Sequence, residues 1–80
     1  MQITIRLLAT YRRYLPPGYH EQESYGLDVA PATTAGEVLA SLPLLPSEAT
    51  TFLVNGRHAE QSQVLQAGDT LTIFPPAGGG

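Results

Sequence analysis

The chain has 80 residues, enough for one domain with one hydrophobic core. Apolar residues make up 42% of it and charged residues 14%, a composition that excludes a solvated disordered tail. The net charge of −3 disfavours nucleic-acid binding, and the lack of cysteine excludes disulfides, thiolate metal ligands and a cysteine nucleophile within the chain. No basic leader or long apolar segment follows Met1. We therefore expect a soluble, cytoplasmic protein that contacts no membrane.

The first half of the sequence predicts two strands separated by an irregular segment. Residues 2–8 alternate between apolar and polar side chains, with one face formed by Ile3, Ile5 and Leu7. Residues 9–22 contain the breaker Pro16-Pro17-Gly18 and predict a short turn or helical fragment followed by a loop. A second strand is expected over residues 24–30, where Tyr25, Leu27 and Val29 alternate.

A short helix is predicted next. Thr34 and Glu37 have the spacing of a capping box, immediately before the apolar residues Val38, Leu39 and Leu42. Pro43 and Pro46 should end this helix after two or three turns, because proline lacks an amide donor and clashes with the preceding turn.

The second half of the sequence predicts strands joined by tight turns. The apolar run Phe52-Leu53-Val54 is followed by Asn55-Gly56, a dipeptide that favours a type I′ turn, so a hairpin through residues 57–60 is expected. Ala67-Gly68-Asp69 predicts another turn, and residues 70–74 alternate as a last strand.

This order of elements predicts an α+β domain, with a mixed sheet and one short helix packed across a single face. If the first and last strands lie side by side in the middle of the sheet, they are parallel. That arrangement is the ubiquitin-like β-grasp. We place the β-grasp domain at residues 1–76 and a flexible glycine tail at residues 77–80.

The end of the sequence, FPPAGGG, has the composition of an extended finger. Pro75 and Pro76 cannot extend the hydrogen-bond ladder of the last strand and favour a stiff polyproline II segment. The segment after them is thin and adaptable, since it comprises Ala77, Gly78, Gly79 and Gly80. These four residues reach roughly 13 Å, enough to carry a terminal carboxylate into another protein's active site. A frayed terminus is the alternative interpretation.

Three motifs and the opening segment resemble the MoaD/ThiS family of ubiquitin-like sulfur carriers. The motifs are VNG at Val54–Gly56, AGD at Ala67–Asp69 and IFPPAGGG at Ile73–Gly80, and the opening segment is TIRLLATYRRYLPPG at Thr4–Gly18. The resemblance spans nearly the whole chain. Its Phe-Pro-Pro element and the segment between Ala9 and Gly18 are more similar to molybdopterin synthase small subunits than to carriers of the thiazole pathway.

The resemblance implies a mechanism centred on Gly80 and Gly79. A ubiquitin-activating-like adenylyltransferase would use ATP and Mg²⁺ to adenylate the carboxylate of Gly80, and a persulfide from a sulfurtransferase or cysteine desulfurase would convert it to a thiocarboxylate. The tail from Pro75 to Gly80 would then thread into the large subunit of molybdopterin synthase and donate sulfur. The chain would be a cosubstrate rather than an enzyme, and it would bind neither cofactor nor metal itself.

The alternation of the strands also predicts a docking surface. Leu8 and Phe74 fall on the faces opposite to the core residues, so they should lie on the uncovered side of the sheet. His58, just after the hairpin turn, matches a position that is apolar in some relatives, and either joins this surface or is an ordinary surface histidine.

Several alternatives stay open. His20 with Glu21 and Glu23 is spaced loosely for a metal site and is more simply a solvated loop. The absence of lysine reflects either an arginine-rich genome or protection of an activated carboxyl end from attack by the chain's own amines. Besides sulfur transfer in molybdopterin synthesis, three other functions stay open. The chain could be a carrier for another sulfur pathway, a ubiquitin-like protein modifier, or a noncovalent binding module.

Overall fold

The computed structural model describes residues 1–18, 24–42 and 51–75, and these residues form five strands and two short helices. In chain order the elements are β1 (Gln2–Leu7), the 3-10 helix η1 (Ala9–Tyr14), β2 (Ser24–Asp28), α1 (Ala35–Ser41), β3 (Thr51–Val54), β4 (Arg57–His58) and β5 (Thr70–Phe74). Neither helix of this described part of the chain is long and apolar enough to cross a bilayer.

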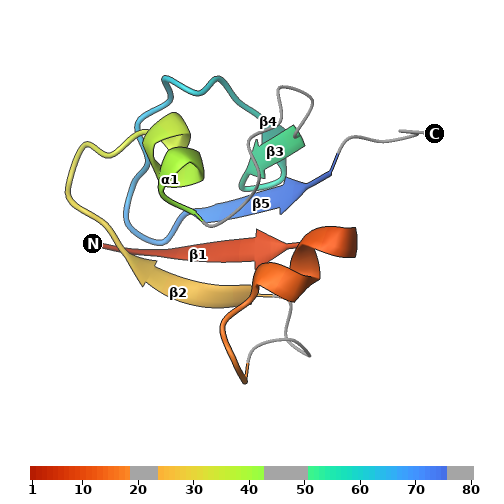
Figure 1. Ribbon diagram of the computed structural model, residues 1–80. Coiled ribbons are helices and arrows are strands. Elements are labelled where there is room, and N and C mark those ends of the chain that lie inside the picture. The colour runs from red at the N-terminus through yellow and green to blue at the C-terminus, as the bar shows by residue number, and fades with distance from the viewer. Residues whose placement is uncertain (19–23, 43–50, 76–80) are drawn as a thin grey trace.

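The strands form one mixed sheet in the order β2-β1-β5-β3-β4. The central pair β1 and β5 is parallel, as the arrows in Figure 1 show, and the other neighbours are antiparallel. The two strands that are furthest apart in the sequence therefore lie side by side. This topology confirms the predicted α+β fold and its parallel central pair, and it is that of a ubiquitin-like β-grasp.

One face of the sheet carries the hydrophobic core. The side chains that β1 and β5 direct there are almost fully buried, and comprise Ile3, Ile5, Leu7, Leu71 and Ile73. The helix α1 lies over this face (Figure 1) and contributes Ala35 and Val38, while Leu42 and Leu65 join from the segments beside it. The period of two in the strands thus separates a core face from a second face that α1 does not cover.

The start of α1 is closed by hydrogen bonds within the chain. Thr34 and Glu37 form the predicted capping box: the Thr34 hydroxyl accepts from the Glu37 amide, and the Glu37 carboxylate accepts from the Thr34 amide. The next two amides, of Ala35 and Gly36, donate to the carbonyls of Gln63 and Gln61 at 2.9 and 2.8 Å. The helix is therefore joined at its first turn to the segment that precedes β5.

The predicted helical fragment after the first strand is the 3-10 helix η1. Tyr11 and Tyr14 pack against the core, with their ring centroids 6.1 Å apart in an edge-to-face arrangement, and Leu15 is buried beside them. The guanidinium of Arg13 lies 5.1 Å from the centre of the Tyr14 ring. This short helix lies beside the end of β1 (Figure 1).

The turns agree with the sequence, whereas three strand ends differ slightly, one being that of the second hairpin strand, which ends at His58 rather than at Glu60. Asn55 and Gly56 both have positive φ, as a type I′ turn requires, and Gly68 has φ of +87°. The first two strands end at Leu7 and Asp28, one and two residues earlier than predicted. After the second strand, the Ala30 carbonyl accepts hydrogen bonds from the Thr33 amide and hydroxyl, which close a turn. The predicted role of Pro43 and Pro46 in ending α1 lies outside the described residues.

Candidate functional site

The last strand leaves the sheet from its centre. β5 lies between β1 and β3, and its final residue, Phe74, pairs with Thr51. The Leu8 amide donates to the Ile73 carbonyl at 3.0 Å, so Leu8 continues alongside the end of β5. Pro75 follows, half-buried and outside the strand, as its missing amide predicts.

The predicted tail beyond this point comprises Pro76, Ala77, Gly78, Gly79 and Gly80, and these residues lie outside the described part of the chain. The strand that carries them is paired with β1 up to Ile73 and with β3 up to Phe74. The base of the predicted finger is therefore held by two neighbouring strands.

The face of the sheet away from α1 is here called the open face. Residues paired across neighbouring strands point to the same side, so its members follow from the register. Thr72 of β5 pairs with Arg6 on β1 and with Leu53 on β3, and Leu53 in turn pairs with His58 on β4. Phe74 lies two residues beyond Thr72 on the same face.

Three half-buried apolar side chains gather on the open face near the end of β5. These are Leu8, Leu53 and Phe74, here called the docking patch, and none of the three is among the side chains that pack against the core. The structure thus places Leu8 and Phe74 on the face that the alternation predicted. It shows them half-buried rather than fully exposed, because each has neighbours on an adjacent strand. His58 is exposed and borders the patch through its pairing with Leu53.

Leu53 is the member of the docking patch that the sequence analysis missed. Its segment, Phe52-Leu53-Val54, is apolar at three successive positions, so alternation does not separate the two faces. The turn did contain the signal. A two-residue Asn55-Gly56 loop fixes the register of the hairpin, so placing His58 on the open face already implies Leu53 opposite it.

The centre of the open face is filled rather than hollow. Thr72 is only 7% exposed, although α1 lies over the opposite face of the sheet. It is surrounded by Arg6 and Leu53 on the flanking strands and by Phe74 along its own strand. No buried side-chain polar atom of the described residues lacks a hydrogen-bond partner.

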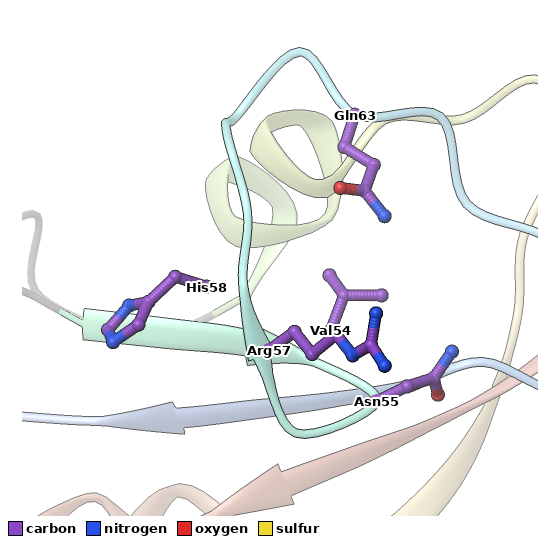
Figure 2. A pocket seen from close by; sticks show the side chains of 5 residues that line it. All are labelled: Val54, Asn55, Arg57, His58 and Gln63. Atoms are coloured by element: carbon purple, nitrogen blue, oxygen red, sulfur yellow. The ribbon is translucent and has the colours of Figure 1, made fainter.

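An open depression of about 530 Å³ lies at the opposite end of the sheet (Figure 2). It is lined by Val54, Asn55, Arg57, His58 and Gln63. Figure 2 shows the His58 ring pointing away from the other four side chains. The depression lies at the β3–β4 turn, beside the start of β5, so it is separate from the point where the last strand leaves the sheet.

The described residues contain few side chains that could bind a metal ion or take part in catalysis. No three His, Asp or Glu side chains among residues 1–18, 24–42 and 51–75 are grouped to hold a metal ion. The loosely spaced set His20, Glu21 and Glu23 lies outside these ranges. Burial raises the pKa of the Tyr25 hydroxyl, on the core face of β2, which keeps that group protonated.

Solved structures share the fold of this chain at low sequence identity. SAMP1 from Haloferax volcanii is 22% identical with a TM-score of 0.76, and the match covers all of both chains. The HVO 2177 protein of the same organism is 27% identical with a TM-score of 0.75, over all of this chain and 87% of that one. A Pyrococcus furiosus protein, named as a candidate molybdopterin converting factor, subunit 1, is 14% identical with a TM-score of 0.75, over 95% of this chain and 98% of that one.

The comparison of sequences gives the family. A search of curated proteins finds no match. The sequence model of the ThiS family matches residues 5–80, from the middle of β1 to the last glycine. The chain therefore belongs to the ThiS family, as a ubiquitin-like protein of the MoaD/ThiS sulfur-carrier type.

Proposed function

We propose that this chain carries sulfur as a thiocarboxylate on Gly80 and donates it in molybdopterin synthesis. The observation that carries the proposal is the family match, which extends through Gly79 and Gly80. The fold supports it, because the last strand leaves the centre of the sheet beside the docking patch. A partner that holds the patch is thus positioned to receive the residues that follow Phe74.

The proposed chemistry needs an activating enzyme. A carboxylate reacts poorly as an electrophile, since its oxygen is a poor leaving group. An oxygen of the Gly80 carboxylate attacks the α-phosphate of ATP and releases pyrophosphate, with Mg²⁺ bound in the activating enzyme. A persulfide sulfur then attacks the acyl carbon and AMP leaves. Reduction of the remaining S–S bond by a thiol frees the thiocarboxylate.

Glycines suit the residues around this reacting carbon. Gly79 and Gly80 present no side chain, so a narrow active site can enclose the carboxylate. Ala77 and Gly78 keep the segment thin, and Pro75 and Pro76 hold it away from the sheet. In this proposal the chain supplies the reacting carboxylate and the docking surface, while every catalytic side chain comes from its partners.

The choice of molybdopterin as the pathway has narrower support. It comes from the Phe74-Pro75-Pro76 element and from the fold shared with the Pyrococcus furiosus protein. The partners would be a ubiquitin-activating-like adenylyltransferase, a sulfurtransferase or cysteine desulfurase, and the large subunit of molybdopterin synthase. Incubation of the thiocarboxylated chain with that large subunit and the pterin precursor checks this choice, with molybdopterin as the expected product.

A second candidate function is protein modification. The fold is shared with the Haloferax volcanii small archaeal modifier protein 1, at 21% identity and a TM-score of 0.76. A modifier would join Gly80 to lysines of other proteins. This chain has no lysine, so a second copy offers no side-chain amine for extending a polymer. If the chain is a protein modifier, we therefore expect each acceptor lysine to carry a single copy of it. In cells these conjugates would be seen as heavier forms of the acceptor proteins, without polymers of the modifier.

Intact mass spectrometry tests the carrier function. The chain is incubated with ATP, the activating enzyme of the same organism and a sulfur source, and the mass of the C-terminal peptide is measured. We expect an oxygen-to-sulfur increase located on Gly80. Matched controls omit ATP or use a chain shortened by Gly79 and Gly80, and both should keep their mass. An unchanged wild-type mass with an enzyme that is active on another carrier contradicts the proposal.

A further inference from the structure

The outer side of β2 is an unpaired edge of the sheet within the described residues (Figure 1). β2 stands at one end of the strand order, and β1 is its neighbour there. The Val29 amide donates to the Met1 carbonyl at 2.8 Å, whereas the Thr4 amide donates to Asp69, away from β2. Because the hydrogen-bonding direction alternates along a strand, every second residue of β2 directs its amide and carbonyl outward. These outward residues are Ser24, Gly26 and Asp28.

The β2 edge has few of the features that keep edge strands from pairing with another chain. Such strands are commonly protected by proline, lysine or a bulge. β2 has the sequence SYGLD, and its register with β1 runs without a break over all five residues. Gly26 at its centre has no side chain, so a second backbone can approach it closely. The three outward residues extend over roughly 14 Å and can accept a further strand.

A second copy of β2 fits this edge in one register better than in others. If the two strands run antiparallel about a two-fold axis at Gly26, the two Gly26 residues face each other. Ser24 of each copy then faces Asp28 of the other, and every outward amide and carbonyl of β2 has a partner. A shift by two residues leaves one outward residue of each strand unmatched. The edge is therefore self-complementary, as a two-fold symmetric interface requires.

The apolar side chains of β2 agree with this register. Tyr25 and Leu27 are half-buried and pack against the core of their own copy. Across the two-fold axis, Tyr25 of one copy faces Leu27 of the other in a pair with Cα atoms about 4.5 Å apart. The two pairs cover apolar surface that each copy leaves exposed at this edge. Burial of that surface favours association.

The charged side chains of the open face agree as well. Arg6 pairs with Ser24 within one copy, and both Arg6 and Asp28 are exposed. In the joined sheet, Asp28 of the second copy follows Ser24 in the same row, so its backbone is roughly 10 Å from that of Arg6. The long arginine side chain extends over the small serine toward the carboxylate. Within one copy the backbones of Arg6 and Asp28 are roughly 14 Å apart, so the second copy offers the closer partner.

We propose that two copies of this chain associate through β2 and form one continuous sheet. The occupant is a second copy because the backbone edge, the apolar pair and the charged pair all match themselves about Gly26. β1 separates β2 from β5 in each copy, so both docking patches stay accessible. The two-fold axis directs the two β5 strands oppositely, so the tails leave at opposite ends of the joined sheet. The association requires no reaction at Gly80 and goes beyond the carrier function.

Sedimentation equilibrium of the full chain tests the association directly. A pair of five-residue strands buries less surface than the about 1,200–2,000 Å² of a standard stable interface. We therefore expect a concentration-dependent dimer with a dissociation constant of about 0.01–1 mM. The average mass should rise from one copy toward two as the concentration increases. A chain that is still monomeric at about 2 mM overturns the proposal.

A charge exchange tests the register. Arg6→Glu and Asp28→Arg each place like charges across the interface and should weaken association at least about tenfold. The double variant restores opposite charges and the net charge of −3, so it should associate within about threefold of the wild type. Arg57→Glu has the same net charge as Arg6→Glu but lies exposed on β4, at the other edge of the sheet. It should also stay within about threefold of the wild type.

Gly26→Pro tests the backbone contacts. Proline removes the outward amide of Gly26 and none that bonds to β1, so the variant should fold and lose the dimer. Gly26→Ala keeps the amide and is the matched control. Circular dichroism checks the fold of every variant, and the charge exchange still decides if the proline variant does not fold.

Two results contradict pairing through β2. Association that persists in folded Gly26→Pro shows that another surface joins the copies. A double charge variant that associates as weakly as both single variants shows that Arg6 and Asp28 do not meet. Thiocarboxylation of Gly80 is measured separately on the same protein, so failure of the dimer leaves the carrier function standing.

Discussion

The side-chain amide of Asn55 donates a hydrogen bond of 2.9 Å to the carboxylate of Asp69, fourteen residues further along the chain. The Asn55 side-chain oxygen accepts from the Thr70 amide at 2.9 Å, and the second Asp69 oxygen accepts from the Gln66 amide at 2.8 Å. Two family motifs, VNG and AGD, thus form one hydrogen-bonded unit at the start of β5. Their part in this protein is structural, since they join the β3–β4 turn to the last strand.

Removal of the Asp69 carboxylate should therefore loosen both turns. We expect Asp69→Ala to lower the free energy of unfolding by about 1–2 kcal/mol, because the donors of Asn55 and Gln66 lose their acceptor at a partly exposed site. Asp28→Ala, at an exposed carboxylate of the edge strand β2, should change it by less than about 0.5 kcal/mol. Urea unfolding of the two variants measures the difference, and equal stabilities would show that the joined turns add nothing.

Phe74 provides the sharpest test of the docking patch. Because it lies outside the core cluster, Phe74→Ala should keep the fold yet weaken binding of the activating enzyme by about 2 kcal/mol, the loss typical of an aromatic anchor. Val64→Ala is the matched control, since Val64 is 53% exposed and lies in the segment before β5 rather than on the open face. Calorimetric titration gives both affinities. A Phe74→Ala variant that binds like the wild type would remove the patch from the docking model.

Ala32 is held in an unfavourable backbone conformation. Its φ of +69° lies in the left-handed region, which costs a residue with a Cβ atom about 1 kcal/mol. Ala32→Gly should therefore raise the melting temperature, with a gain of a few tenths of a kcal/mol to about 1 kcal/mol. The neighbouring change Ala30→Gly should lower it, because it only adds freedom to the unfolded chain. Thermal unfolding of both variants gives their melting temperatures. If both variants are less stable than the wild type, the backbone of Ala32 is not strained.

The buried hydroxyl of Tyr25 makes stability depend on alkaline pH. Its pKa is raised above 10.0 by burial, so the unfolded chain loses this proton first as the pH rises. Tyr25 thus contributes no pH dependence below about 10, and above it the free energy of unfolding decreases toward the folded-state pKa. Tyr25→Phe should show a shallower alkaline decrease than the wild type in urea titrations. Its stability at neutral pH serves as the reference, and parallel alkaline curves would refute the effect.

Local rules predicted most of the fold. The helix start at Thr34 and the turn at Asn55-Gly56 both depend on neighbours within four residues, and both are confirmed. The parallel pairing of β1 and β5 was predicted on the condition that the first and last strands lie side by side, and the structure confirms that they do.

The open face was less accessible to sequence reasoning, because it depends on which strands become neighbours. Alternation assigned Leu8 and Phe74 to the uncovered side, but Leu53 joins them only once β3 lies next to β5. The burial of Thr72 depends on the same pairing, because Leu53 on β3 lies beside it. The hydrogen bond from Asn55 to Asp69 likewise connects two turns, each of which the sequence predicts from its own residues without indicating that the two lie side by side.

The central position of β5 also has a mechanical consequence. A partner that grips the end of the chain pulls on Phe74 along the strand axis, while β1 and β3 hold β5 from both sides. Their hydrogen bonds run across the direction of pull, so the ladder is loaded in shear and its bonds must break together rather than one after another. Force applied at the tail is thus distributed over the hydrogen bonds of the central strands. The sheet should therefore stay folded while a partner binds and pulls on the C-terminal residues.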